Sequence, residues 1–268
     1  MSGVNNPTFS ISSTGEARID GILHQEAWSE STINYSFPTN TSVFDYTTFN
    51  PFDNQVDWLV DSFRAVSDDQ EDATHFALNA DIGGAASSGF SVEGFTSVQI
   101  NHDATPDSGN PEHIRVSGTT DSQLGTARVA DFPEGDGTGP EDDDGDVWFG
   151  PSNNNFRNPR AGNYEWHTHL HEVGHALGLA HGHNSGGGLD TLPNSWDTME
   201  YSVMTYRSYV GAPTSGYVNE NWGYAQTYMM LDIAALQHLY GADYSTNSGD
   251  TVYSWAPGSG DTMVNGNT

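Results

Sequence analysis

The spacing of apolar residues along the chain predicts one long helix and several short strands. Apolar residues recur at helical spacing from Gln55 to Val66, which predicts a helix packed behind a sheet. Short apolar or alternating runs bounded by Gly, Asn, Asp and Pro predict strands. These runs lie at residues 33–38, 76–78, 97–100, 113–116, 126–130 and 147–149. Residues 1–16 are rich in Ser, Asn, Gly and Thr, and we expect them to be loosely ordered.

One stretch has the residue spacing H-E-x-x-H-x-x-G-x-x-H, formed by His171, Glu172, His175, Gly178 and His181. On a helix the first two histidines are one turn apart, so both imidazoles can hold one metal ion. The glutamate lies beside them, where it can hydrogen-bond a water. The glycine permits a turn that can deliver the third histidine as a ligand. Three nitrogen ligands and an open fourth position are typical of a catalytic zinc site.

The shorter H-E-x-x-H pattern arises by chance on histidine-containing helices, but the added glycine and third histidine make the full pattern far more specific. His167, His169 and His183 lie close by in the sequence and are rival ligands. Because Thr168 follows His167, the pair of His167 and His171 has no general base. We therefore expect these three histidines to lie beside the site or at the surface.

These motifs resemble the metzincin clan of zinc endopeptidases. Ser202–Tyr206, with the sequence S-V-M-T-Y, resembles the methionine turn of that clan, and within it the serralysin and astacin pattern. Gly145–Phe149, Gly162–Tyr164 and Leu231–Ala242 favour serralysins. The resemblance covers roughly residues 20–245.

The resemblance implies an α+β fold with a twisted, mostly parallel five-stranded sheet, an active-site helix and a backing helix. A smaller C-terminal subdomain would hold the methionine turn and a C-terminal helix at 232–240. The implied organisation is a partly disordered leader at 1–30, a protease domain at 31–243 divided at Gly178, and a tail at 244–268. The tail contains only faint echoes of the calcium-binding repeats that follow this domain in the family. Two alternatives stay open: the tail is the stub of a missing repeat domain, or the protein does without one.

The resemblance also implies roles for residues of this chain. Zinc would be bound by His171, His175 and His181, and Glu172 would act as the general base. Tyr206 would ligate zinc at rest and then stabilise the oxyanion. An extended peptide would bind along an edge strand at Thr126–Ala130; a merely solvated edge is the alternative. The segment Tyr217–Tyr228 would border the pocket for the residue after the cut bond. The competing functions are a catalytically silent secreted binding or adhesive module on the same fold, and a hydrolase of non-peptide amides.

The chain is strongly acidic, which limits its partners. It has 36 acidic and seven basic residues, a net charge of −29, no lysine and no cysteine. This composition excludes lysine-dependent and thiol catalysis and argues against nucleic acid and anionic membranes as partners. No apolar run approaches the ~20 residues of a membrane span. No N-terminal signal is evident; by resemblance to serralysins, which carry a C-terminal export signal, we expect a secreted, extracellular monomer.

The segment from Glu134 to Asp146 concentrates acidic side chains, at positions 134, 136, 141, 142, 143, 144 and 146. Such oxygen clusters attract calcium, but the ligand spacing of an EF-hand loop is missing. We therefore expect a solvated acidic loop at one end of the substrate groove, with Ca²⁺ binding as the alternative.

Overall fold

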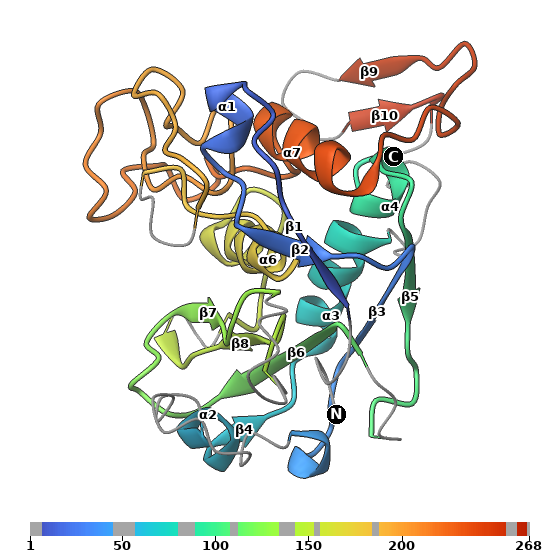
Figure 1. Ribbon diagram of the computed structural model, residues 1–268. Coiled ribbons are helices and arrows are strands. Elements are labelled where there is room, and N and C mark those ends of the chain that lie inside the picture. The colour runs from blue at the N-terminus through green and yellow to red at the C-terminus, as the bar shows by residue number, and fades with distance from the viewer. Residues whose placement is uncertain are drawn as a thin grey trace.

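A mostly parallel sheet, as expected for a metzincin domain, lies at the centre of the larger lobe. The computed structural model describes residues 7–44, 57–79, 89–107, 112–133, 143–152, 156–183, 188–255 and 262–266. Among the described residues this sheet has six strands, not the five expected. The strand order is β5-β3-β6-β8-β7, and β4 (Phe63–Arg64) pairs with β6 off this path (Figure 1). These strands are β3 (Thr32–Ser36), β5 (Gln99–His102), β6 (Ile114–Thr119), β7 (Ala127–Val129) and β8 (Val147–Phe149). All neighbours in this order are parallel except β7, which runs antiparallel to β8 at the edge.

Two helices pack together over this sheet. Helix α3 (Asp68–Leu78) contacts helix α6 (Tyr164–Ala176), and α6 also contacts β7 and β8. The N-terminus of α3 is fixed because the Gln70 side chain accepts a hydrogen bond from the Ser67 amide at 3.2 Å. Helix α3 is therefore the helix that packs behind α6.

Two sequence assignments, one within α3 and one before it, are wrong. Residues 76–78, predicted as a strand, form the last turn of α3. Short apolar runs do not distinguish a strand from a helix end, and here the cap at Ser67 starts a helix that continues through them. The helix predicted for 55–66 is the short α2 (Asp57–Asp61) followed by β4 (Phe63–Arg64), which pairs with β6; residues 55 and 56 lie outside the described ranges. Phe63 packs against Trp148, so its burial comes from the sheet.

The N-terminal segment packs against the rest of the molecule. Strand β1 (Thr8–Ser10) pairs antiparallel with β2 (Glu26–Trp28), and the short helix α1 (Ala17–Asp20) contacts helix α7 (Met230–Tyr240). The loosely ordered segment predicted for 1–16 is therefore wrong for residues 8–10. The indole of Trp28 donates to the Ala176 carbonyl at 2.8 Å, at the end of α6. The boundary proposed at residue 30 stays a prediction.

The remaining elements lie mainly around α7, in a second lobe that Figure 1 shows above α6. They are the short helix α4 (Val92–Phe95), the hairpin of β9 (Tyr253–Trp255) and β10 (Thr262–Val264), and, in the larger lobe, the 3-10 turn η1 (Thr41–Val43). Figure 1 shows α6 between the lower part of the sheet and the lobe that contains α1 and α7. No helix among the described residues is long and apolar enough to cross a membrane.

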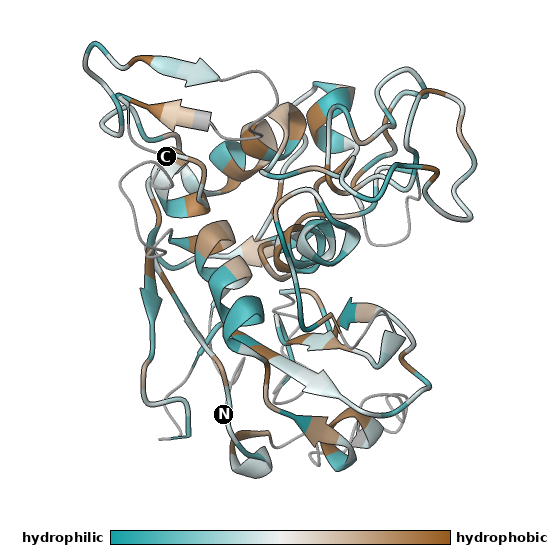
Figure 2. Cartoon of the chain, turned by 180° about the vertical axis from the view of Figure 1, so that it is seen from behind, coloured by the Kyte–Doolittle hydropathy of each residue, from teal (hydrophilic) through white to brown (hydrophobic). Residues whose placement is uncertain are grey.

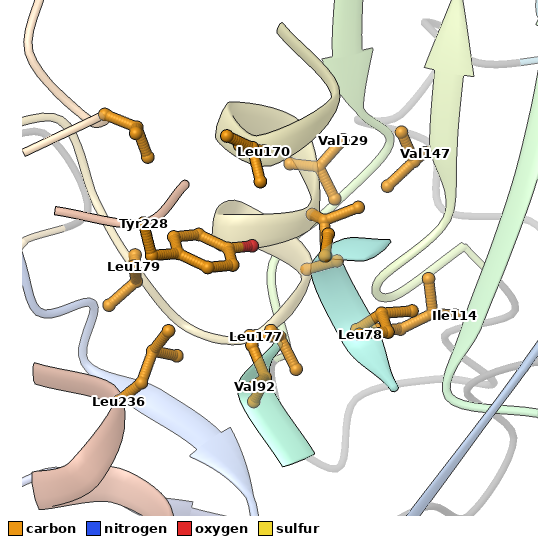
Figure 3. Packing of buried hydrophobic residues seen from close by; sticks show 14 of the residues in the cluster. Leu78, Val92, Ile114, Val129, Val147, Leu170, Leu177, Leu179, Tyr228 and Leu236 are labelled. Carbon is orange, nitrogen blue, oxygen red and sulfur yellow. The ribbon is translucent and has the colours of Figure 1, made fainter. Parts of the chain in front are cut away.

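One apolar core joins the two lobes and supports α6. Figure 3 shows Leu170 of α6 between Val147 of the sheet and Tyr228, which precedes α7; all three are buried. In contrast, the peripheral strand β5 is largely hydrophilic (Figure 2), and three of its four residues are exposed. The helix that carries the histidine motif is thus held by burial along most of its length.

Candidate metal centre and active site

Helix α6 carries the central motif and is fixed at both ends. At its start, Asn163 Oδ1 accepts a hydrogen bond from the Trp166 amide at 2.9 Å, as an N-cap does. After its end, Gly178 has φ = 94°, and a Cβ atom there would lie 3.0 Å from the Glu26 carbonyl oxygen. Residues with a side chain rarely adopt this conformation. The glycine therefore turns the chain and lets β2 approach the turn closely.

Three imidazole nitrogens come together beside α6, two of them from the helix itself and one from the chain after it. His171 Nε2 lies 3.1 Å from the Nε2 atoms of both His175 and His181, which are 2.9 Å from each other. Within the described ranges, this is the one group of histidine, cysteine and carboxylate side chains close enough to share an ion. Four tetrahedral ligands at the usual zinc distance of ~2.0–2.1 Å lie about 3.3 Å apart, so the observed spacing fits one ion.

The hydrogen bonds of the rings show which nitrogens are available. His171 Nδ1 lies 2.7 Å from the Val203 carbonyl and His175 Nδ1 lies 2.7 Å from the Leu179 carbonyl. A carbonyl only accepts, so each Nδ1 must carry the proton, and each neutral ring presents a lone pair at Nε2. The two Nε2 atoms lie 3.1 Å apart, and since each carries a lone pair and no proton, they repel one another and cannot hydrogen-bond. A cation between them relieves this repulsion.

Burial keeps these rings neutral. It lowers the pKa of His171 to about 3 and that of His181 to about 3, and it lowers the pKa of His175 well below its usual value. The neighbouring imidazoles add to the effect by mutual repulsion of their charged forms. All three are therefore ready to act as neutral nitrogen ligands at pH 7.

Glu172 lies between this triad and the edge strand β7. Burial raises its pKa to about 8, against the opposing effects of the Arg128 charge and the Val129 backbone amide. Both of those groups belong to β7. A cation on the adjacent histidines would favour the ionised carboxylate. Glu172 is thus placed beside both the candidate metal ligands and the strand expected to bind substrate.

The turn at 202–206, which resembles a methionine turn, packs against helix α6 beside the three histidines. Met204 is fully buried, and a Cβ atom on Gly174 of α6 would lie 2.8 Å from its sulfur. A larger residue at 174 would therefore push the turn away from the helix. The same turn supplies the Val203 carbonyl that orients His171.

Tyr206, at the end of this turn, reaches the triad. Its hydroxyl lies 3.0 Å from His181 Nε2, and burial raises the pKa of the phenol well above its usual value. Together with His171 and Glu172 it lines a cavity of about 230 Å³ that is also bordered by β7. The structure therefore brings together every residue that the sequence suggested for the site, namely His171, Glu172, His175, His181 and Tyr206.

The rival histidines do not join the triad. His167 is buried one turn before His171 and lines the same cavity, where its Nε2 lies 3.1 Å from the Tyr217 hydroxyl. His169 points the other way and stacks on Phe149 with ring centroids 4.0 Å apart. His183 lies beside His181, with ring centroids 5.4 Å apart.

Two residues important for the site carry no local sequence signal. Tyr217 donates to the Thr205 carbonyl at 2.6 Å and forms a wall of the cavity. Asp232 of α7 accepts from the Val203 amide at 2.9 Å and from the Ser202 hydroxyl at 2.6 Å. The only available hint was the resemblance of the segments that contain them to a serralysin.

The acidic segment at 134–146 is only partly within the described ranges, which omit residues 134–142. Asp144 and Asp146 are buried, so the expectation of a wholly solvated loop is wrong at these two positions. Asp146 accepts from the Arg115 amide at 3.2 Å, and its carboxylate lies 3.8 Å from the Arg115 guanidinium. The binding of calcium at this segment stays a prediction.

Known proteins similar to this chain are metalloproteases. No protein-family model matches the chain. Metallopeptidase AprA of Pseudomonas marginalis is 36% identical over 167 residues, which cover 57% of this chain and 33% of that protein. Serralysin B of Dickeya chrysanthemi is 38% identical over 117 residues, covering 41% of this chain and 23% of its own length. Metalloprotease AprA of Pseudomonas entomophila is 45% identical over 100 residues, 35% of this chain and 21% of that protein. The chain thus spans a third or less of the relatives it matches.

Proposed function

We propose that this chain, whose relatives support a serralysin-like metzincin family, is a zinc-dependent endopeptidase that hydrolyses peptide bonds of extended substrates. The observation that carries the proposal is the convergence of three Nε2 atoms beside Glu172. Two of these nitrogens have their lone pairs fixed by hydrogen bonds on the other side of the ring. The alternative of a catalytically silent binding module has no supporting observation, because ligands, base and tyrosine are all present.

His171, His175 and His181 would hold the zinc ion. Zinc, when bound there, supplies a Lewis acid that polarises a carbonyl oxygen and acidifies water. The chain's own contribution is to keep the three rings neutral by burial and to orient two of them through backbone carbonyls.

Glu172 would move the proton in the reaction. Its carboxylate would accept a proton from the attacking water and then deliver it to the leaving amine. A general base works best when its pKa is near the operating pH, and burial raises this pKa from 4.5 toward that range. Arg128 and the Val129 amide favour the ionised form that must be present before the attack.

Tyr206 would stabilise the negative charge that develops on the carbonyl oxygen. Because burial raises the pKa of its phenol, the hydroxyl keeps its proton at neutral pH and can donate a hydrogen bond. The hydroxyl now lies next to His181, so it would ligate the metal at rest and turn toward the substrate during the reaction.

The substrate would bind in extended form along β7. This strand is at the edge of the sheet and leaves one side open for another strand. The cavity beside the triad is bordered by residues 126 and 127 of this edge, so a peptide on β7 would pass over Glu172. By the same family resemblance we infer a secreted monomer.

The test separates the base from the ligands. Glu172→Gln should retain about one zinc per chain but lose roughly 10²- to 10⁴-fold in kcat on a quenched fluorescent peptide. His175→Ala should lose both the metal and the activity. Zinc content and turnover are measured on the same preparations. Near-normal kcat in the Glu172→Gln enzyme would contradict the proposal.

A further inference from the structure

A second hollow lies next to the catalytic cavity, and its chemistry suits a cation. It is lined by Asn163, Tyr164, Glu165, Asn221, Trp222 and Tyr224 and has a volume of about 420 Å³. Tyr164 lines both hollows, so the two lie side by side. Three aromatic rings and one carboxylate therefore surround a space adjoining the proposed active site.

The carboxylate of Glu165 has no cation to neutralise it. Among the residues that the structure describes, no ion pair or side-chain hydrogen bond involves Glu165, and the neighbouring Arg160 pairs with Asp69 at 3.0 Å. The charge is nevertheless felt by the aromatic walls. Burial raises the pKa values of Tyr164 and Tyr224, and the negative charge of Glu165 adds to the rise in both. Glu165 thus lies close enough to act together with these rings.

The aromatic wall is unusually open at Trp222. This side chain is 66% exposed, and its indole contacts no other ring among the described residues. A large exposed indole beside an unpaired carboxylate offers both interactions that bind a basic side chain, namely cation–π contact and charge-assisted hydrogen bonding. An acidic side chain would be repelled by Glu165, and a small apolar one would leave the carboxylate unused.

We propose that this second hollow, hereafter the aromatic–acidic subsite, binds an arginine or lysine side chain of the substrate. The inference rests on the proposed endopeptidase function and adds a substrate preference to it. Glu165 precedes His171 by six positions on α6, or about 9 Å along the helix axis at ~1.5 Å per residue. An extended peptide advances ~3.3 Å per residue, so on a peptide that runs alongside α6 the basic side chain would lie two or three residues from the cut bond.

The side of the cut bond follows from the neighbouring cavity. Tyr217 walls the cavity beside the metal and, by the family resemblance, that region receives the residue after the cut. The aromatic–acidic subsite lies beyond it, so it takes the second or third residue after the cut bond. This site differs from the acidic segment at 134–146, which comes from another part of the chain.

The experiment uses matched peptides with lysine, norleucine or glutamate at each of the first three positions after the cut. Lysine should exceed norleucine in kcat/KM by roughly five- to tenfold at one position only, the second or third. Glu165→Gln should reduce this ratio toward one, and Glu165→Asp should retain part of it. Glu200→Gln removes the same charge from an exposed position outside both hollows and serves as the matched control; its ratio should equal that of the wild type.

A second measurement keeps binding separate from turnover. Calorimetry with uncleavable peptides should give a Kd for the lysine peptide about five- to tenfold below that for norleucine, and Trp222→Ala should reduce the difference. Melting temperature and zinc content verify that each variant is folded. A lysine-to-norleucine ratio near one in both measurements, or one unchanged by Glu165→Gln, would overturn the subsite. Absence of peptide cleavage together with a normal binding ratio would instead overturn the endopeptidase proposal alone.

Discussion

Asp232 and His171 are connected through a single residue, Val203. The Asp232 carboxylate accepts a hydrogen bond from the Val203 amide, and the Val203 carbonyl lies 2.7 Å from His171 Nδ1. The same carboxylate also accepts from Ser202 Oγ and the Met229 amide, so it joins the methionine turn to the start of α7. A residue in the C-terminal helix thereby positions a ring of the proposed metal site.

We predict that Asp232→Ala weakens zinc binding without removing a ligand. Loss of the carboxylate leaves a buried amide and hydroxyl without their acceptor and lets the Val203 carbonyl shift away from His171. Zinc affinity should fall about 10- to 100-fold, the usual effect of losing support behind a ligand. Competition with a chromophoric chelator measures the affinity. Asp250→Asn, at an exposed position near the C-terminus, is the control. Equal affinity in the wild type and Asp232→Ala would show that the turn holds its shape unaided.

The histidine motif was predictable because its spacing is local. Helical periodicity alone places His171 and His175 on one face, and the glycine and third histidine follow within six residues. Asp232 and Tyr217 could not be found in this way, because they reach the site through contacts made across long stretches of sequence. The structure places all the predicted site residues around one point, but their catalytic roles stay proposals until tested.

The fold was predictable where burial and periodicity agree. The edge position of 126–130 was expected, and β7 occupies it. The strand predicted at 76–78 failed because three apolar residues fit either structure, and the deciding feature was the cap nine residues earlier at Ser67. The helix predicted at 55–66 failed because the pairing of β4 with β6 overrides local spacing.

Gly178→Ala should destabilise the protein and disturb the third histidine. Its φ of 94° is unfavourable for alanine, and the new methyl group would lie 3.0 Å from the Glu26 carbonyl oxygen. We expect a loss of about 1–3 kcal/mol in the free energy of unfolding, with weaker zinc binding through His181. Gly211→Ala isolates the backbone effect, since φ there is 83° and no atom lies within 4 Å. Denaturant unfolding of both variants measures the difference. If they lost equal stability, the contact with β2 would have no importance.

Removal of the metal should lower thermal stability as well as activity. The Nε2 atoms of His171 and His175 lie 3.1 Å apart with their lone pairs toward each other. A bound cation relieves this repulsion only in the folded state. We expect the melting temperature to fall on treatment with a zinc chelator and to recover when zinc, but not magnesium, is restored. Scanning calorimetry of His175→Ala provides the control, because chelator should leave that variant unchanged. A wild-type melting temperature insensitive to chelator would contradict a metal shared by these rings.

The last prediction concerns Glu112, a buried carboxyl far in sequence from the motif. Burial raises its pKa to about 7, although the Ser36 hydroxyl and the Arg115 charge both act in the opposite direction. The folded protein therefore holds a proton at this carboxyl that the unfolded chain, with a pKa near 4.5, releases at lower pH. A group with a raised pKa in the folded state contributes stability below the unfolded value and loses it as pH rises through the folded value.

Between pH 5 and pH 8 this group should thus lower the stability of the wild type as pH rises. Glu112→Gln keeps the shape and cannot ionise, so its melting temperature relative to the wild type should increase from pH 5 to about pH 7 and then level off. Measuring the difference between the two proteins cancels the contribution of the other acidic residues. Glu200→Gln, at an exposed position, should show no such trend. A constant difference between wild type and Glu112→Gln from pH 5 to pH 8 would mean that Glu112 ionises alike in the folded and unfolded states.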